Sequence, residues 1–374
     1  MRDILAERLL GAVMEWTPEE LARERPDLQA MAAYKYDEYQ QFAPGMRFVE
    51  SLATWLKQFR TAEDRGVAYD FVKRKLIFCS ATEMNHLVAM AYPDLIRPQL
   101  LRRVARSGGY EEWRVSRAAS SVEFRVFRRR TLFLGLSDGA RLDAFRRYNH
   151  SELSHEQVWQ TYEIPDQRVD DLIDRLTSDL TEILDAAPVL GERTFTTVIL
   201  LDDFSASGIS YIRKEDDGTF SGKIAKFHEE LVDAESPISR IVERSNLEVM
   251  VVLYMATSQA LDYLSALAEE LWEPLGVRSS VLAVYPLGPE IRVQPGDGNR
   301  VGQLLENYYD PSIEDEFTQK GGTDLKFGFA GCGLPVVLNH NTPNNSIYIL
   351  WAEPPSGGAL RPLFPRVSRH RRAS

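Results

Sequence analysis

Residues 196–210 constrain the fold more than any other stretch, because an apolar run there ends abruptly in two acids and a loop of small residues. The run Val198 to Leu201 is short and stopped by charge, which is typical of a strand buried on both faces. In an open parallel sheet, ligands bind just beyond the carboxyl ends of the strands. The stretch therefore predicts a central parallel strand with a binding site at its end.

Two kinds of polar group follow this expected strand. Asp202 and Asp203 come first, and carboxylates side by side suit a polyol or a metal ion. Residues 205–210 come next, and a loop of small residues can turn its backbone N–H groups toward an anion. The alternative interpretation is a core strand that ends in a solvated acidic turn.

The arrangement resembles the phosphoribosyl-diphosphate motif of the type I phosphoribosyltransferases. That motif has four apolar residues, two acids, two apolar residues and a small hydroxyl loop with a central glycine, and eleven of the thirteen positions from Val198 to Ser210 agree with it. The departures are Phe204, where a smaller apolar residue is usual, and Ser205, where an aliphatic residue is usual.

The resemblance implies a role for each part of the motif. Asp202 and Asp203 would hold the ribose 2′- and 3′-hydroxyls, with Mg²⁺ as the cofactor near them. The loop would wrap the 5′-phosphate through Ser205, Ala206, Ser207, Gly208, Ile209 and Ser210. Ala206 stands where some purine-type members carry an aspartate that acts on the base, so that route to base protonation is absent.

A second small-residue loop follows another apolar run, residues 131–136, and leads into an expected helix. A strand that ends at a helix amino terminus forms an anion site by geometry. In the resembled family, the loop at the matching place holds the pyrophosphate, which implies that Arg141 holds the leaving pyrophosphate together with Ser137, Asp138, Gly139 and Ala140. The alternative is an ordinary strand-to-helix turn.

Strand and helix patterns alternate from residue 131 to residue 285. Further strands are expected at 247–255 and 277–285, and helices at 166–187 and 258–272. Such alternation predicts an α/β fold with a doubly wound, mostly parallel sheet. Residues 1–74 are expected as a helical N-terminal extension, 75–355 as the phosphoribosyltransferase-like domain and 356–374 as a basic flexible tail. The run 75–80 is expected as the first strand of the sheet.

The segment after Ser210 departs from the simple family pattern, because a hairpin is expected around residues 216–218 before the next helix. Lys223 follows this hairpin and is a candidate phosphate contact. A solvated hairpin with no role in binding is the alternative.

Amide and imidazole side chains crowd into residues 339–345. They are expected to form a hood that reads a base edge, through Asn339, His340, Asn341, Asn344 and Asn345. Because Asn and Pro favour turns, a purely structural turn is the alternative. This stretch and the hairpin resemble the phosphoribosyltransferase-like proteins of bacterial conflict and antiphage systems, and that resemblance implies a defence role with a companion defence protein.

Residues 97–147 are rich in arginine. Residues 96–150 hold thirteen Arg, no Lys and five acids, a net charge of +8, within a chain of net charge −11. Nucleic-acid binding is one interpretation, and pairing of these arginines with acids elsewhere in the chain is the preferred one. Within this region residues 124–126 are expected as an edge strand, and beyond it Ser154 is expected to cap another helix.

The remaining features bound the location and the activity. Two cysteines cannot form a disulfide framework, and no apolar run reaches the length of a membrane span. We therefore expect a soluble, cytoplasmic protein that binds no membrane, and the family resemblance implies a ribose-phosphate or nucleotide small molecule as its ligand. An enzyme acting at the ribose anomeric carbon is the leading hypothesis, and a non-catalytic nucleotide sensor on the same fold is the alternative.

Overall fold

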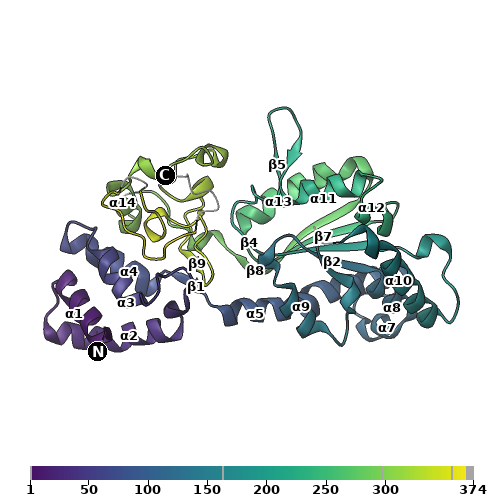
Figure 1. Cartoon of the computed structure of the whole chain (residues 1–374), viewed down its shortest axis with the longest axis horizontal. Helices are drawn as coiled ribbons and strands as arrows, with labels where there is room; N and C mark the ends of the chain where they lie inside the picture. The colour runs from purple at the N-terminus through teal and green to yellow at the C-terminus, as the bar shows by residue number, and fades with distance from the viewer. Residues whose placement is uncertain (1, 162–163, 297, 355–356, 368–374) are drawn as a thin grey trace. The chain divides into compact units, whose positions relative to one another are not determined.

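A computed structural model describes residues 2–161, 164–296, 298–354 and 357–367 (Figure 1). The chain forms two compact units by contact. One is continuous, Met84–Gly288, and the other joins Met1–Glu83 to Pro289–Ser374. This grouping divides the chain differently from the three segments expected at boundaries 74 and 355.

The continuous unit is built on a five-stranded sheet in which every pair of neighbours is parallel. The strand order is β3-β2-β4-β7-β8. The strands are β2 (Thr131–Gly135), β3 (Val158–Gln160), β4 (Thr197–Ser205), β7 (Glu248–Thr257) and β8 (Arg278–Leu287). The expected strands at 131–136, 198–201, 247–255 and 277–285 are thus confirmed.

Helices cover both faces of this sheet. Successive apolar side chains of β2 point to opposite faces, and each face packs against helices. Leu132 and Leu134 point into one apolar core, which also holds Leu176 of α10 and Leu264 of α13. Phe133 points to the other face, where its ring packs on Phe145 of α9, with centroids 5.3 Å apart. The doubly wound α/β fold is therefore confirmed. Helix α5 (Ala81–Met90) begins in the other unit and enters this one at Met84. The α-helices wholly within this unit are α6 (Arg97–Ser107), α7 (Val115–Ser120), α8 (Val122–Arg129), α9 (Leu142–Asn149), α10 (Val169–Leu184), α11 (Lys223–Val232), α12 (Pro237–Ile241) and α13 (Ser258–Trp272).

Two local expectations, one in the arginine-rich region and one just after it, are wrong. Residues 124–126 form part of helix α8 and not an edge strand, because Ser121 caps the helix by accepting a hydrogen bond from the Phe124 backbone N–H at 3.1 Å. Ser154 caps only a short 3₁₀ turn, His155–Gln157, and not a longer helix.

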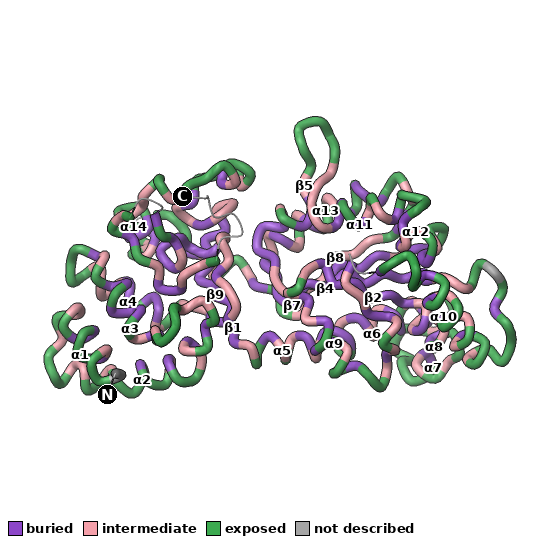
Figure 2. The backbone as a smooth tube through the Cα atoms, in the orientation of Figure 1, coloured by how far each residue is buried: buried purple, intermediate pink, exposed green. Residues whose placement is uncertain are grey.

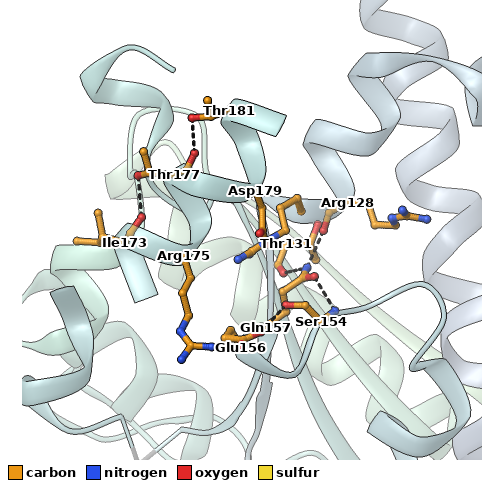
Figure 3. Close-up of polar contacts among 11 residues, drawn as sticks. Arg128, Thr131, Ser154, Glu156, Gln157, Ile173, Arg175, Thr177, Asp179 and Thr181 are labelled. Atoms are coloured by element: carbon orange, nitrogen blue, oxygen red, sulfur yellow. Dashed lines mark hydrogen bonds and ion pairs between the residues drawn. The ribbon is translucent and has the colours of Figure 1, made fainter. Parts of the chain in front are cut away.

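Strand β3 follows that turn directly and was not anticipated from the sequence. The Gln157 side chain fixes its start, because its Nε2 donates to the backbone oxygens of Thr131 at 2.8 Å and Arg128 at 2.7 Å (Figure 3). A buried amide thereby satisfies two carbonyl groups and ties β3 to β2. Three residues are too few to show a period in sequence.

The other unit gathers the two ends of the chain. It contains α1 (Arg2–Met14), α2 (Pro18–Tyr34), α3 (Phe48–Leu56), α4 (Ala62–Arg74) and α14 (Arg300–Asn307), and the helical N-terminal region is therefore confirmed. Strand β1 (Ile77–Cys79) pairs in parallel with β9 (Val336–Leu338) in a separate two-stranded sheet. The expectation that residues 75–80 open the main sheet is wrong, because their partner lies about 260 residues further along the chain.

Aromatic side chains dominate the core of this second unit. Phe364 packs its ring on Tyr36, Phe48 and Phe78, with centroids 5.8, 6.0 and 5.8 Å away. Leu363 and Phe364 are fully buried, so residues expected in a flexible tail are packed up to residue 367. Residues 368–374 of that expected tail lie outside the described residues.

Candidate functional site

The strand order reverses between β2 and β4, which are neighbours in the sheet. The chain runs from β2 outward to β3, returns to β4 beside β2, and continues to β7 and β8. In open α/β sheets, the crevice at such a reversal is where ligands bind. The loops that leave β2 and β4 here are Ser137–Ala140 and Ser205–Ser210, the two anion-binding loops that the sequence predicts. The fold therefore brings these two loops to one edge of the sheet.

Asp202 lies at this edge and is completely enclosed. Its exposed fraction is zero, and its Oδ1 accepts a hydrogen bond from the Ser137 hydroxyl at 2.5 Å. Its Oδ2 lies 2.5 Å from the Lys223 ammonium. Burial raises the pKa of the Asp202 carboxyl, the neighbouring Asp203 raises it further, and Lys223 and Ser137 oppose the rise. Lys223, which the sequence predicts as a phosphate contact, thus forms an ion pair with Asp202.

Asp203 is only half-buried, and it faces the loop after β2. Its Oδ1 accepts a hydrogen bond from the Phe204 backbone N–H at 2.8 Å. A Cβ atom added to Gly139 would lie 2.6 Å from the Asp203 Cγ, closer than side chains approach one another. Glycine at position 139 is therefore what allows the loop after β2 to lie against this carboxylate.

The loop after β4 turns sharply at Gly208, where φ is +82°. A Cβ atom there would lie 2.6 Å from the Tyr263 ring. Gly208 O accepts hydrogen bonds from the backbone N–H groups of Tyr211 and Ile212, and Ala206 O accepts one from the Thr257 hydroxyl. Within the described residues, no group accepts a hydrogen bond from the backbone N–H of residues 207–210. The loop thus carries four N–H groups that an anion would satisfy.

Arg141 and Ala140 close the loop after β2. Arg141 has a left-handed backbone, with φ at +48°, and precedes the first residue of α9. Its Nη1 donates to the Asn85 Oδ1 at 3.2 Å. The Tyr254 hydroxyl, which is buried, donates to the Ala140 backbone oxygen. Tyr254 is a site residue that the sequence reasoning missed, although a tyrosine inside an apolar strand signals a hydroxyl that needs a buried partner.

The predicted hairpin is confirmed beside this site. Strands β5 (Arg213–Lys214) and β6 (Phe220–Ser221) pair in antiparallel fashion, and α11 starts at Lys223. Figure 2 shows the tip of the hairpin as exposed. Its root is packed, because Lys223 Nζ also lies 4.7 Å from the centroid of the Tyr211 ring.

The asparagine cluster belongs to the other compact unit, and two of its side chains, those of Asn341 and Asn345, have hydrogen-bond partners there. Asn345 Nδ2 donates to Phe329 O at 3.1 Å and contacts Cys332 Sγ at 3.4 Å. Asn341 Oδ1 accepts from the Thr342 N–H at 3.0 Å. Backbone groups of the other three residues bond to other segments of the same unit. Asn339 bonds to Gln40 and Cys79, His340 O accepts from the Gln41 side chain, and Asn344 O accepts from the Phe329 N–H. The base hood remains a prediction.

Many side chains of the arginine-rich stretch pair with acids inside their own unit. Arg103 lies 2.8 Å from Glu248 and Arg129 lies 2.5 Å from Asp179. A cavity of about 300 Å³ at the outer edge of β3 is lined by Arg146, Arg168 and Arg175 among others, but each of these also pairs with a carboxylate. The pair of Arg175 and Glu156, 2.6 Å apart, is visible in Figure 3. These contacts agree with the preferred interpretation, that the arginines neutralise acids.

Two further features of the described residues are their lack of a membrane-spanning helix and of a group of metal-ligating side chains. None of the helices in the described ranges combines the length and apolar character that a bilayer crossing requires. Among the same residues, no group of three or more His, Cys, Asp or Glu side chains is placed to hold a metal ion.

Comparison with known proteins gave one match. The model of the PRTase-CE family matches residues 52–366, which spans most of both compact units. No curated protein and no solved structure matches the chain.

Proposed function

The chain belongs to the PRTase-CE family, a phosphoribosyltransferase-type family, and from this premise we propose that it binds phosphoribosyl diphosphate or a related nucleotide and acts at the ribose anomeric carbon. The observation that carries the proposal is the site at the strand reversal. Four backbone N–H groups of residues 207–210 lie in the loop that leaves β4, next to the half-buried Asp203. That combination suits a 5′-phosphate joined to a ribose diol.

The two loops take different parts of the ligand in this proposal. Residues 207–210 hold the 5′-phosphate by their N–H groups. Asp203 accepts hydrogen bonds from ribose hydroxyls and stabilises the positive charge that builds on the ring as the bond from the anomeric carbon to the pyrophosphate oxygen breaks. The departing pyrophosphate carries that electron pair, and Arg141 at the end of the loop after β2 holds it. The anomeric carbon then bonds to the acceptor.

Mg²⁺ fits this donor set in only one way. Asp203 offers a single carboxylate, and Mg²⁺ is commonly bound by one or two carboxylates with substrate phosphates and waters. Asp203 would therefore hold the ion jointly with ligand oxygens, where it neutralises pyrophosphate charge.

Calorimetric titration tests the central claim. Phosphoribosyl diphosphate is titrated, with and without Mg²⁺, into the wild type, Asp203→Asn and the matched control Asp262→Asn, which neutralises an exposed acid on α13. We expect Asp203→Asn to weaken binding by about tenfold or more, since hydrogen bonds to a charged group are worth roughly 1.5–3 kcal/mol. Equal affinities in all three proteins would refute the proposal.

A nucleotide sensor without catalysis is the second candidate, and Ala206 favours it. The residue that could protonate a base in related enzymes is an alanine here, and it is buried. A sensor would bind a nucleotide and leave it intact for hours. Release of pyrophosphate or free base by the pure protein, lost in Asp203→Asn, would decide for the enzyme.

The base hood is proposed on sequence grounds. Asn341 and Asn345 have hydrogen bonds that hold the turn, whereas Asn344 contributes its backbone oxygen to Phe329 N at 2.8 Å. Replacing Asn344 by Ala should therefore change which base is accepted and leave ribose-phosphate affinity intact. An unchanged base preference would leave the cluster as a turn.

A defence role in the bacterial cytoplasm, with a companion protein, rests on the sequence resemblance. The experiment is plaque counting on cells that carry the gene with its neighbours, compared with cells that carry Asp203→Asn. Equal plaque numbers would remove the defence role and leave the ligand chemistry untouched.

Nucleic acid is a separate candidate partner, for the arginine-rich stretch. Binding to RNA or DNA with a steep salt dependence would support it.

A further inference from the structure

The carboxylate of Asp202 has no free surface. Oδ1 accepts hydrogen bonds from the Ser137 hydroxyl at 2.5 Å and from the Asp203 backbone N–H at 3.1 Å. Oδ2 is held by the Lys223 ammonium at 2.5 Å. With an exposed fraction of zero, this side chain cannot also contact a ribose hydroxyl unless one of these partners leaves.

Asp202 and its two side-chain partners come from three separate segments. Ser137 opens the loop after β2, Asp202 lies near the end of β4, and Lys223 is the first residue of α11, after the hairpin. The contacts join positions 65 and 21 residues apart along the chain. The carboxylate therefore connects the loop after β2 to the helix after the hairpin, with the strand between them.

The local backbone delivers Lys223 to this place. Gly222 has φ at +115°, and a Cβ atom on it would lie 2.6 Å from the Tyr211 backbone oxygen. Only glycine allows this close approach. The Lys223 ammonium then lies between the Asp202 carboxylate and the face of the Tyr211 ring, whose hydroxyl donates to Phe204 O at 2.9 Å. Cation, acid and ring thus form one packed group.

We propose that Asp202 is a positioning residue, paired with Lys223, and that Asp203 alone of the two acids binds the ribose. The clause on ribose rests on the proposed function. Asp202 and Lys223 act through the two loops: they fix the loop after β2 and the root of the hairpin around the ligand. Their charges matter to each other and not to the ligand.

This proposal makes a specific prediction about charge. Lys223→Gln leaves the fully buried Asp202 carboxylate without its cation, which is strongly destabilising, whereas Asp202→Asn leaves an ammonium whose side chain is 24% exposed to solvent. Replacing both by neutral amides, in Asp202→Asn/Lys223→Gln, removes both charges and allows a hydrogen bond between the two side chains. The double variant should therefore be more stable than Lys223→Gln, and no such recovery would be seen for two unrelated sites.

The first experiment measures thermal unfolding of the wild type, Asp202→Asn, Lys223→Gln and the double variant. We expect the unfolding temperature to fall in Lys223→Gln and to recover in the double variant. This result needs no ligand, so it stands or falls independently of the proposed function. A double variant that is as unstable as the sum of the single variants would overturn the pairing.

The second experiment titrates phosphoribosyl diphosphate with Mg²⁺ into the double variant and into Asp203→Asn. We expect the double variant to stay within about threefold of the wild type, whereas Asp203→Asn loses about tenfold or more. A folded double variant that loses as much affinity as Asp203→Asn would make Asp202 a ligand-binding residue and overturn the proposal. Absence of binding by the wild type would instead refute the proposed function and, with it, the clause on ribose.

Ser137→Ala gives a further test if the double variant does not fold. This change keeps both charges and removes two hydrogen bonds of the Ser137 hydroxyl, the one it donates to Asp202 Oδ1 and the one it accepts from the Gly139 backbone N–H at 3.3 Å. We expect a folded protein with severalfold weaker ligand binding, because the loop after β2 loses its attachment. Affinity equal to that of the wild type would count against the connection between the two loops.

Discussion

The loops that leave β2 and β4 lie at the same edge of the sheet but are built differently. Other residues of the chain already contact the loop after β2, since Gly139 lies against Asp203 and the Tyr254 hydroxyl donates to Ala140 O. The loop after β4 keeps the backbone N–H groups of residues 207–210 without an acceptor among the described residues. The loop after β2 is therefore held by contacts within the protein, whereas the loop after β4 has backbone N–H groups available to bind an anion.

This difference shows why similar sequence patterns do not imply similar roles. Both loops follow a buried strand and contain small residues, and both were predicted as anion sites. Only neighbouring segments decide whether the N–H groups and carboxylates of a loop are already satisfied. We therefore assign the stronger anion site to residues 207–210.

The largest effect is expected at Gly208. Gly208→Ala forces a left-handed backbone on a residue with a side chain, at φ +82°, and places a Cβ atom 2.6 Å from Tyr263. Strain of this kind costs about 1–3 kcal/mol, and we expect loss of phosphate binding with it. Urea unfolding and calorimetric titration give the two values.

Gly276→Ala is the matched control for that change. Its φ is +64°, but no atom lies within 4 Å of the added Cβ. It should show the backbone cost alone, about 1–2 kcal/mol, with unchanged ligand affinity. If Gly208→Ala kept wild-type affinity, the loop after β4 would not be the anion site.

A smaller effect is expected at Gly139, on the other side of the comparison. Gly139→Ala must displace the Asp203 carboxylate, because the added Cβ would lie 2.6 Å from its Cγ. We expect ligand affinity to fall about tenfold through the loss of a charged hydrogen bond, with little change in unfolding free energy. Gly66→Ala, in open space within α4, is the control and should stabilise by about 0.5–1 kcal/mol. Unchanged affinity in Gly139→Ala would separate Asp203 from the ligand.

The smallest effect concerns pH, and it tests the acid that lies between the loops. Burial raises the pKa of Asp202 in the folded protein, so the folded state holds this proton more tightly than the unfolded state. The stability that this proton contributes is present at low pH and is lost as the pH rises above about 3.9. Relative to Asp202→Asn/Lys223→Gln, the wild type should therefore lose unfolding temperature as the pH rises from about 4 toward neutrality. A difference that stays constant across this range would contradict the raised pKa.

The sequence by itself determined the elements whose signals lie within a few residues of one another. Helix α13 begins and ends where its apolar period does, and β4 contains the predicted run with both acids at its end. The hairpin was also predictable, because Asp216, Asp217 and Gly218 form its turn. In each case the spacing of apolar residues or the turn residues suffice, since they act locally.

Only the tertiary structure decided which segments meet. From the sequence, Asp202 and Asp203 were predicted to have equivalent roles. Nothing in it showed that Ser137 and Lys223 enclose Asp202. It also placed residues 75–80 in the wrong sheet, and it gave no sign that Phe364 packs against rings from residues 36–78. The physical reason is that burial and pairing depend on which strands become neighbours. That choice is made by the apolar cores of the whole chain and not by any short stretch within it.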